Sequence, residues 1–238
     1  MARSFDGVDD VITTAAVVPP SSGYTMSMWL RASDVTATDV FFVWGQRIAS
    51  ENYFNQNIIL NKDIYFRIFE GSVLGDFIGR IATASVTSNN IWYHICGTWD
   101  GGTTNASCKI FINGVQKDDA NSGSGIFTGS NTNSIIKIFG AQEVTPSGYD
   151  NLFSGQIAHT QLFNRPLSAG EIRQIMQFPG SLSRGLIGYW PLWGSGSPEP
   201  DYSGNGNNGT VTGAIKGTSE PPINGIFQVP RPELVRSF

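Results

Sequence analysis

The sequence predicts an all-β fold, a two-sheet antiparallel sandwich with one short helix and an extended C-terminal arm. The stretch Ile91–Gln116 carries the first observation, because its β-branched and aromatic residues suit a pleated, packed surface. Gly101-Gly102 and Asn113-Gly114 interrupt it as turns, so one hairpin leads directly into another. Since both faces of these strands are apolar, we expect them to be central and covered on both sides.

The second observation is strict alternation in Tyr24–Arg31, the period-2 pattern of a sheet strand. Asn61-Lys62-Asp63 predicts a tight turn between two further strands, and Gly155 marks a bulge. The predicted strands outside the central hairpin are Ser4–Phe5, Val11–Thr14, Tyr24–Arg31, Val40–Gly45, Ile58–Leu60, Ile64–Phe69, Gly79–Val86, Ser134–Phe139, Leu152–Phe163 and Gly185–Leu192. Asp118–Asn133 and Gly140–Asn151 are polar and predict long exposed loops.

One helix is predicted after residue 167. Ser168 and Glu171 match a capping box, with Ser168 as the N-cap and Glu171 at the third helical position. An apolar stripe follows, and Phe178-Pro179-Gly180 ends the helix. We expect this helix to lie against an edge of the sandwich.

The composition changes after the last predicted strand. We expect residues 1–194 to form the sandwich and residues 195–238, rich in Gly and Pro, to form the arm. The arm carries scattered apolar residues that would be costly to leave in water, namely Ile223, Ile226, Phe227, Val229, Leu234, Val235 and Phe238. These residues are expected to pack on the domain itself or on a neighbouring subunit.

Composition narrows the class of partner. The net charge is −4 and only 14% of residues are charged, so the chain has no basic footprint for nucleic acid. The N-terminus has no apolar signal-peptide region, and no apolar run approaches the roughly 20 residues of a membrane span. A neutral surface rich in hydroxyl and amide groups favours sugars or other proteins as partners.

The cysteines and histidines are few. Cys96 and Cys108 lie on the two arms of one hairpin, and we expect both to be reduced and buried. His94 lies within an apolar strand, which predicts a core histidine. His159 is the only other histidine, so the sequence lacks the histidines that nucleophilic triads and zinc sites usually need.

Three stretches together resemble the laminin-G-like, concanavalin-A-like jelly rolls, over about residues 3 to 178. They are Ser4-Phe5-Asp6-Gly7-Val8-Asp9-Asp10-Val11, then Trp92–Gly101 with Ile110–Gly114, then Phe153–Ile157 with Phe163–Ser168 and Glu171-Ile172. The resemblance implies two antiparallel sheets of six or seven strands, one of them concave. Gly185–Leu192 and Asp201–Thr210 are also similar to this family, but to a segment that usually comes first. Either this strand is supplied in permuted order, or it pairs with another copy.

The layout as a whole is similar to accessory proteins encoded by tailed bacteriophages. That resemblance implies a structural role in a virion, as a capsid-decorating or tail-associated protein. Its partners would be other virion proteins or copies of itself. Lysis would release it outside the cell without a signal peptide. The alternative function is a carbohydrate-binding module for cell-surface glycans, with or without calcium.

Enzymatic activity is not expected. Glucanases of this architecture need two acids about 5–5.5 or 6.5–9.5 Å apart. Their Glu-x-Asp-x-x-Glu spacing is absent, and the strand Ile157–Phe163 carries Ala158-His159-Thr160-Gln161 instead. His159 also replaces one carboxylate that the resemblance would have assigned to calcium.

Calcium remains the one candidate cofactor. Asp201, Ser203, Asn205 and Asn207 space oxygen ligands every two residues, with glycines that let the loop curl. Asp9 and Asp10 could add negative charge. The alternative is an Asx-turn loop whose side chains satisfy its own backbone.

Sugar-binding candidates come from aromatic residues and polar loops. Most of the six tryptophans are expected in the core, whereas Trp193, beside Gly194, is the one expected to be exposed. The loops 121–133 and 144–151 are the predicted rim surface. The candidate ligand-binding residues are therefore Trp193, Tyr149, Asn131 and Asn133.

Overall fold

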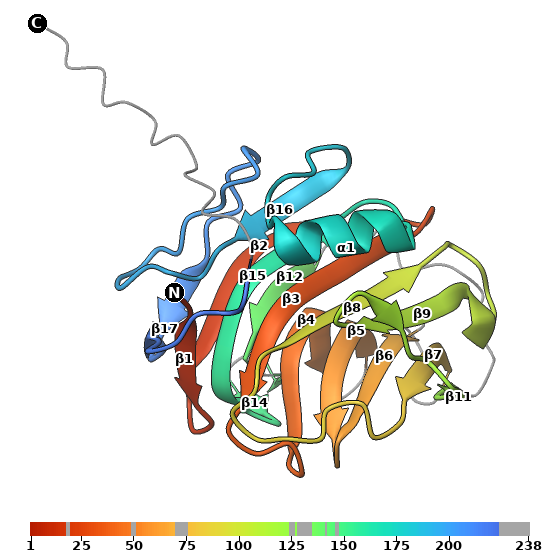
Figure 1. Ribbon diagram of the computed structural model, residues 1–238, viewed down its shortest axis with the longest axis horizontal. Helices are drawn as coiled ribbons and strands as arrows, with labels where there is room; N and C mark the ends of the chain where they lie inside the picture. The colour runs from red at the N-terminus through yellow and green to blue at the C-terminus, as the bar shows by residue number, and fades with distance from the viewer. Residues whose placement is uncertain are drawn as a thin grey trace, which may run out of the picture.

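The protein is a two-layer antiparallel β sandwich, as the sequence predicts (Figure 1). The structure is a computed structural model, which describes residues 1–17, 20–48, 51–69, 76–123, 127, 135–140, 142–145 and 148–223. Two sheets, here called sheet A and sheet B, contain eight described strands each. A two-stranded hairpin, β13 (Gln142–Thr145) and β14 (Gly148–Asp150), pairs with neither sheet.

Sheet A carries the central hairpin. Its strands are β1 (Arg3–Asp6), β3 (Tyr24–Ala32), β8 (Tyr93–Trp99), β9 (Cys108–Ile112), β10 (Val115–Gln116), β15 (Ser154–Phe163), β16 (Leu186–Trp190) and β18 (Ile215–Lys216). They run in the order β10-β9-β8-β3-β15-β1-β18, and β16 also pairs with β15. One edge of β15 is therefore shared by β1, along Gly155 to Ile157, and by β16, along Thr160 to Phe163.

Sheet B forms the second layer. Its strands are β2 (Val11–Val17), β4 (Thr38–Ile48), β5 (Glu51–Leu60), β6 (Asp63–Phe69), β7 (Phe77–Ala82), β11 (Ala120–Asn121), β12 (Ile135–Phe139) and β17 (Thr210–Thr212). Their order is β11-β7-β6-β5-β4-β12-β2-β17. The predicted turn between β5 and β6 is confirmed, because Asn61 and Lys62 both take left-handed φ angles of 48° and 72°.

Alternating residues of the two sheets meet in the main core. Met26, Met28 and Leu30 of β3 face Ile64, Phe66 and Ile68 of β6, all at 1% exposure or less. The two sheets pack so closely here that position 97 must be a glycine. A Cβ there would lie 2.4 Å from the Phe66 ring. Sheet A is also covered on its outer side, which explains why both faces of its central strands are apolar.

The cover is the helix α1 (Ala169–Gln177). A short 3₁₀ turn, Asn105–Ser107, lies elsewhere, between β8 and β9. The helix lies across the outer face of sheet A in Figure 1, and Ile172 and Ile175 pack on Cys96 and Phe111. The prediction that it would lie at an edge is therefore wrong, because its apolar stripe needs a face to bury against. Both cysteines are free and buried, as predicted. No helix in the described part of the chain is long and apolar enough to cross a membrane.

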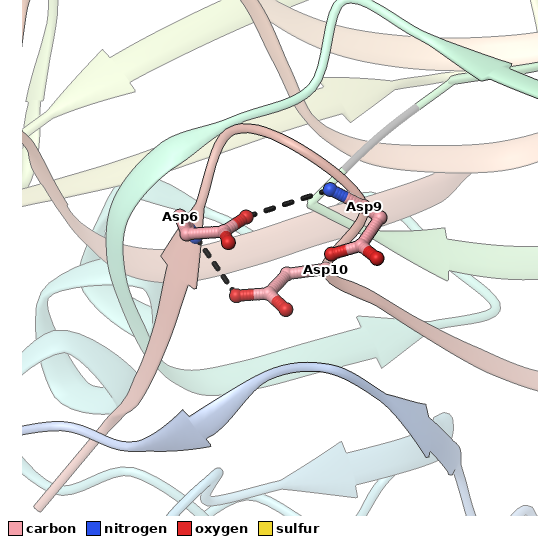
Figure 2. A group of neighbouring side chains, drawn as sticks. All are labelled: Asp6, Asp9 and Asp10. Carbon is pink, nitrogen blue, oxygen red and sulfur yellow. Dashed lines mark hydrogen bonds between the residues drawn. The ribbon is translucent and has the colours of Figure 1, made fainter.

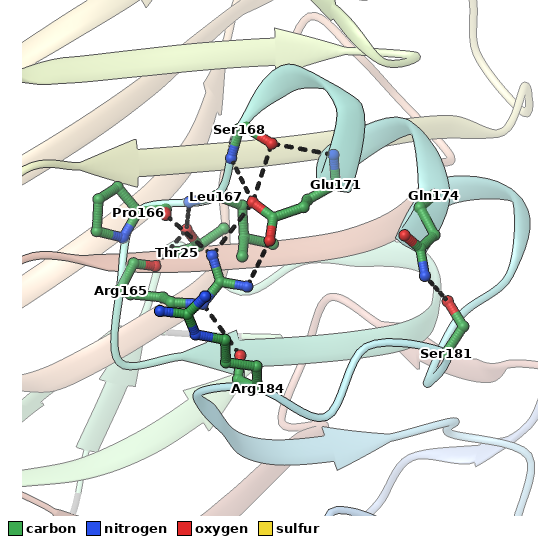
Figure 3. A network of polar contacts seen from close by, with 9 residues as sticks. All are labelled: Thr25, Arg165, Pro166, Leu167, Ser168, Glu171, Gln174, Ser181 and Arg184. Carbon is green, nitrogen blue, oxygen red and sulfur yellow. Dashed lines mark hydrogen bonds and ion pairs between the residues drawn. The ribbon is translucent and has the colours of Figure 1, made fainter.

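The capping box at the start of α1 is confirmed and is part of a larger polar network (Figure 3). The Ser168 hydroxyl accepts the Glu171 N–H at 3.3 Å, and Glu171 Oε2 accepts the Ser168 N–H at 2.9 Å. Arg165 donates to both carboxylate oxygens of Glu171, at 2.6 and 3.1 Å. These hydrogen bonds lower the pKa of Glu171 to about 2.

We expect Glu171→Gln to lower the free energy of unfolding by about 1 kcal/mol, because it weakens the cap and removes a partly exposed ion pair. The lowered pKa means that this contribution is present above about pH 4.5 and is lost as the pH falls towards 2. Urea unfolding at pH 7 measures it. Gln174→Ala, on the exposed side of α1, is the control and should change little; equal effects of the two variants would contradict the role of the cap.

The described part of the predicted arm, residues 195–223, packs on its own domain. β16 pairs with β15 of the same chain, β17 with β2 and β18 with β1, so the permuted strand is supplied in cis. Ile223 packs beside Trp29 and Trp92 on the outer face of sheet A. The other docking residues, Ile226, Phe227, Val229, Leu234, Val235 and Phe238, lie outside the described residues.

Three smaller predictions are wrong. The stretch 118–133 was predicted to be an exposed loop, yet it supplies β11 and places Phe127 in the core at 5% exposure, edge-on to Trp99. The stretch Gly140–Asn151, also predicted to be a loop, contains the hairpin of β13 and β14. The bulge in β15 falls between Ala158 and Gln161, and Gly155 itself pairs regularly with Ala32.

Candidate functional site

The outer face of sheet B carries a group of aromatic side chains around one arginine. Along β6, Ile64, Phe66 and Ile68 point into the core, so Tyr65, Arg67 and Phe69 lie on the opposite face. β7 adds Phe77, which pairs directly with Phe69. The two rings stack with centroids 4.8 Å apart and planes 21° from parallel. We call Tyr65, Arg67, Phe69 and Phe77 the sheet-B platform.

Arg67 lies between the aromatic rings of this platform. Its guanidinium carbon is 4.3 Å from the centroid of the Tyr65 ring and 5.6 Å from that of Phe77. Both distances fall within the range of cation–π contacts. Burial lowers the pKa of Arg67, and Tyr65 opposes that shift. The guanidinium therefore lies among the rings and is partly removed from water.

Neighbouring strands fix the position of Arg67. Its Nε–H donates to Ser122 Oγ at 2.8 Å, and the Ser122 N–H donates to the Gly79 carbonyl at 3.0 Å, just beyond β11. Gly79 lies directly opposite Arg67 on β7. A Cβ at Gly79 would come within 2.5 Å of the Phe66 carbonyl oxygen and 3.2 Å of Arg67 Cγ, so only glycine allows this close approach.

The predicted ligand residue Trp193 belongs to a second aromatic group, on the side of β15 and β16. Its ring meets His159 edge-on at 6.1 Å and Tyr202 edge-on at 5.9 Å, and Tyr189 stacks on His159 at 6.2 Å. Trp193 is half-buried rather than fully exposed, whereas Tyr202 is 37% exposed. Of the other predicted ligand residues, Tyr149 is half-buried in β14, while Asn131 and Asn133 lie outside the described residues.

The loop 201–207, the predicted calcium site, is closed by its own hydrogen bonds. Asp201 Oδ1 accepts from the N–H groups of Tyr189 and Ser203, both at 2.9 Å. Asp201 Oδ2 accepts from the Ser203 hydroxyl at 2.8 Å and the Asn207 N–H at 2.9 Å. The Asn205 and Asn207 amide groups donate to the Ile187 carbonyl. This geometry favours the Asx-turn alternative, and calcium binding here stays a prediction.

A second group of oxygen ligands lies in the turn between β1 and β2. One carboxylate oxygen from each of Asp6, Asp9 and Asp10 lies within 4.8 Å of the others (Figure 2). Asp10 accepts the Asp6 N–H at 2.8 Å, and Asp6 accepts the Val8 N–H at 2.8 Å. Burial raises the pKa of Asp10, and the charges of Asp6 and Asp9 add to that shift. These contacts shape the turn, and Asp9 and Asp10 form no hydrogen bond with loop 201–207 in the described residues.

Both histidines are buried structural groups. His94 Nε2 lies 2.9 Å from Ser27 Oγ beneath α1, and His159 Nδ1 lies 2.9 Å from the Tyr189 hydroxyl. Burial lowers their pKa values to about 3 and about 4, respectively, so both are neutral at pH 7. His159 has a φ of 50°, and its N–H donates to the Pro191 carbonyl at 3.1 Å. It therefore marks the bulge where β15 passes from β1 to β16.

Sequence reasoning missed the sheet-B platform. Ile64–Phe69 was recognised as a strand, yet no role was assigned to its second face. The available indication was Tyr65 and Arg67 at positions i and i+2 of one strand, which places them on the same face. Phe77 joins them only through strand pairing between β6 and β7, which the sequence does not display.

The chain belongs to the concanavalin A-like lectin/glucanases superfamily. The family model matches residues 5–173, which is most of the sandwich. No curated protein sequence matches the chain significantly. The resemblance drawn from the sequence motifs is thereby confirmed at the level of the family.

Solved structures show the same fold. A candidate carbohydrate-binding protein from Bacteroides ovatus aligns with 93% of this chain and 60% of its own, at 19% identity and a TM-score of 0.62. The heptameric SAP-like pentraxin of Limulus polyphemus aligns over 92% and 95%, at 15% identity and 0.55. The CBM40 domain of the Ruminococcus gnavus IT-sialidase, bound to α2,3-sialyllactose, aligns over 68% and 96%, at 13% identity and 0.50. At these identities the likeness establishes the fold alone.

Proposed function

We propose that this chain is a non-enzymatic carbohydrate-binding domain that holds sugars on the sheet-B platform. The observation that carries the proposal is the pair Tyr65 and Phe77 on the outer face of sheet B around Arg67, with the buried Phe69 stacked on Phe77. The opposite side of the same strands already fills the core, so packing does not require large aromatic residues on the outside.

The platform has the chemistry that a sugar needs. Tyr65 and Phe77 are both half-buried, and the exposed parts of their rings give apolar area for the C–H face of a pyranose ring. The Tyr65 hydroxyl, Ser122 and the guanidinium supply hydrogen-bonding groups around it.

The comparisons support this function more than the virion role. The chain belongs to a superfamily of lectins and glucanases, and two of the similar structures come from proteins named for carbohydrate binding. The chain spans about 60% of the length of the Bacteroides protein, so whole-protein roles do not transfer from it. The capsid-decorating or tail-associated role, with virion partners, stays a prediction from sequence layout.

A glycan array probed with the full chain tests the proposal. Wild-type protein should bind a subset of glycans, and Tyr65→Ala and Phe77→Ala should each weaken that binding about tenfold or more by removing a stacking surface. Tyr202→Ala, in the other aromatic group, is the matched control and should bind as the wild type does. Folded protein that binds no glycan would contradict the proposal. Loss of binding only in Tyr202→Ala would place the site at the aromatic group of Trp193 and Tyr202 instead.

A further inference from the structure

Arg67 is a partly buried cation without a protein counter-ion in the described residues. The ion pairs found there join Met1 with Glu220, Arg3 with Glu199, Arg80 with Asp118 and Arg165 with Glu171. Arg67 instead donates one hydrogen bond, from Nε–H to the neutral hydroxyl of Ser122. Among the described residues, its charge is met only by this hydroxyl and by the faces of Tyr65 and Phe77.

The terminal nitrogens of Arg67 are free to receive a ligand. Neither Nη atom donates a hydrogen bond to a described residue, and neither is among the buried polar atoms that lack a partner. Both therefore remain open to solvent. Because the contact with Tyr65 and the hydrogen bond to Ser122 hold the guanidinium, its position is set before a ligand arrives. A guanidinium in this state presents two parallel N–H donors, the fork that matches a carboxylate or a sulfate.

Two described carboxylates, on β6 itself and on the segment before β11, are engaged elsewhere. Asp63 lies four residues from Arg67 on the same face of β6, about 13 Å away along the strand. Its Oδ1 accepts the Ala84 N–H at 2.6 Å. Asp118 Oδ2 pairs with Arg80, and its Oδ1 accepts the Ile110 N–H. No described carboxylate therefore forms an ion pair with Arg67, although the whole chain carries −4.

We infer that the ligand of the sheet-B platform is an acidic sugar, whose carboxylate or sulfate binds the terminal donors of Arg67 while its ring packs against the exposed parts of the platform's aromatic side chains. This inference rests on the proposed function and narrows it to anionic carbohydrates. A neutral sugar would leave the guanidinium charge uncompensated, and a bare anion would leave the aromatic faces unused. The carboxylate and sulfate share the same chemistry at Arg67, so the experiment separates the two.

The test is titration calorimetry of the full chain with oligosaccharides of matched linkage that are neutral, carboxylated as uronic acids, or sulfated. Wild-type protein should bind at least one anionic series about 10- to 100-fold more tightly than the neutral series. Arg67→Gln should abolish that preference, so that the anionic series binds no more tightly than the neutral series does to the same variant. Arg67→Lys, which keeps the charge but not the fork, should retain only part of the preference.

Arg173→Gln is the matched control, since Arg173 is exposed on α1 over the other sheet. It should not alter the preference. Thermal unfolding of each variant shows that the fold is intact, and Arg67→Lys serves if Arg67→Gln fails to fold. Equal binding of neutral and anionic sugars overturns this inference and leaves the proposed function standing. An anionic preference that survives Arg67→Gln also overturns it. Binding to no sugar at all would contradict both this inference and the proposed function.

Discussion

Arg3→Met should lower the free energy of unfolding by about 3–5 kcal/mol, because it leaves Glu199 buried without its cationic partner. Arg3 is 1% exposed and Glu199 is fully buried. Arg3 Nε donates to Glu199 Oε2 at 2.9 Å, and Nη1 donates to the Ala214 carbonyl at 3.1 Å. Nη2 also donates to the Gly196 carbonyl. One side chain from β1 therefore holds three points of the segment 195–218.

Urea unfolding at pH 7 measures this effect. The double variant Arg3→Met, Glu199→Leu should recover much of the loss, since it removes both charges together. Glu220→Gln is the control at an exposed ion pair, where Glu220 meets the Met1 ammonium, and it should leave stability unchanged. A loss below about 1 kcal/mol in Arg3→Met would contradict the view that this pair anchors the segment to the sandwich.

Acid should destabilise the protein between pH 6.5 and 4.5, before most carboxylates titrate. Burial lowers the pKa of His94 to about 3 and that of His159 to about 4. In the unfolded chain both have a pKa near 6.5, so below that pH the unfolded state binds more protons and stability falls. Each histidine should remove about 1.4 kcal/mol per pH unit over this window.

Asp39 acts in the opposite direction. Burial raises its pKa to about 6, although the Ser154 N–H donates to its carboxylate at 3.3 Å. The folded state therefore takes up a proton at Asp39 between about pH 6 and 4, which restores part of the stability. From pH 7 to pH 4.5 the two histidines should cost about 5 kcal/mol and Asp39 should return about 2, a net loss of about 3 kcal/mol.

Urea unfolding at several pH values checks these signs. Asp39→Asn removes the opposing proton uptake, so its stability should fall more steeply with acid than that of the wild type. His159→Gln should flatten the same curve by about 1.4 kcal/mol per pH unit. A pH profile identical in all three proteins would contradict the assignment of these groups as buried and neutral.

The fold could be predicted from sequence because its determinants are local. The alternation in Tyr24–Arg31, the left-handed Asn61-Lys62 turn and the Ser168–Glu171 capping box all involve residues a few positions apart. The predictions that failed depend on distant partners. Phe127 reaches the core only by packing on Trp99, and α1 covers a sheet face because Cys96 and Phe111 leave apolar area there.

The candidate site was harder to predict for the same reason. Arg67 is unusual through what surrounds it, namely Ser122 from a segment 55 residues away and a glycine across the sheet. Trp193 was selected because it lies outside strand alternation, yet His159 and Tyr202 partly bury it. The oxygen-rich spacing of residues 201–207 predicts a cation as readily as a self-bonded turn, and only the hydrogen bonds distinguish the two.

The location of the sugar on the protein is the central claim, and NMR chemical-shift mapping with a bound oligosaccharide tests it most directly. Our account predicts that the perturbed backbone amides cluster at Tyr65, Arg67, Phe77, Gly79 and Ser122, with the amides around Trp193 and Tyr202 unchanged. Perturbations centred on Trp193 and Tyr202, with β6 and β7 unchanged, would contradict it.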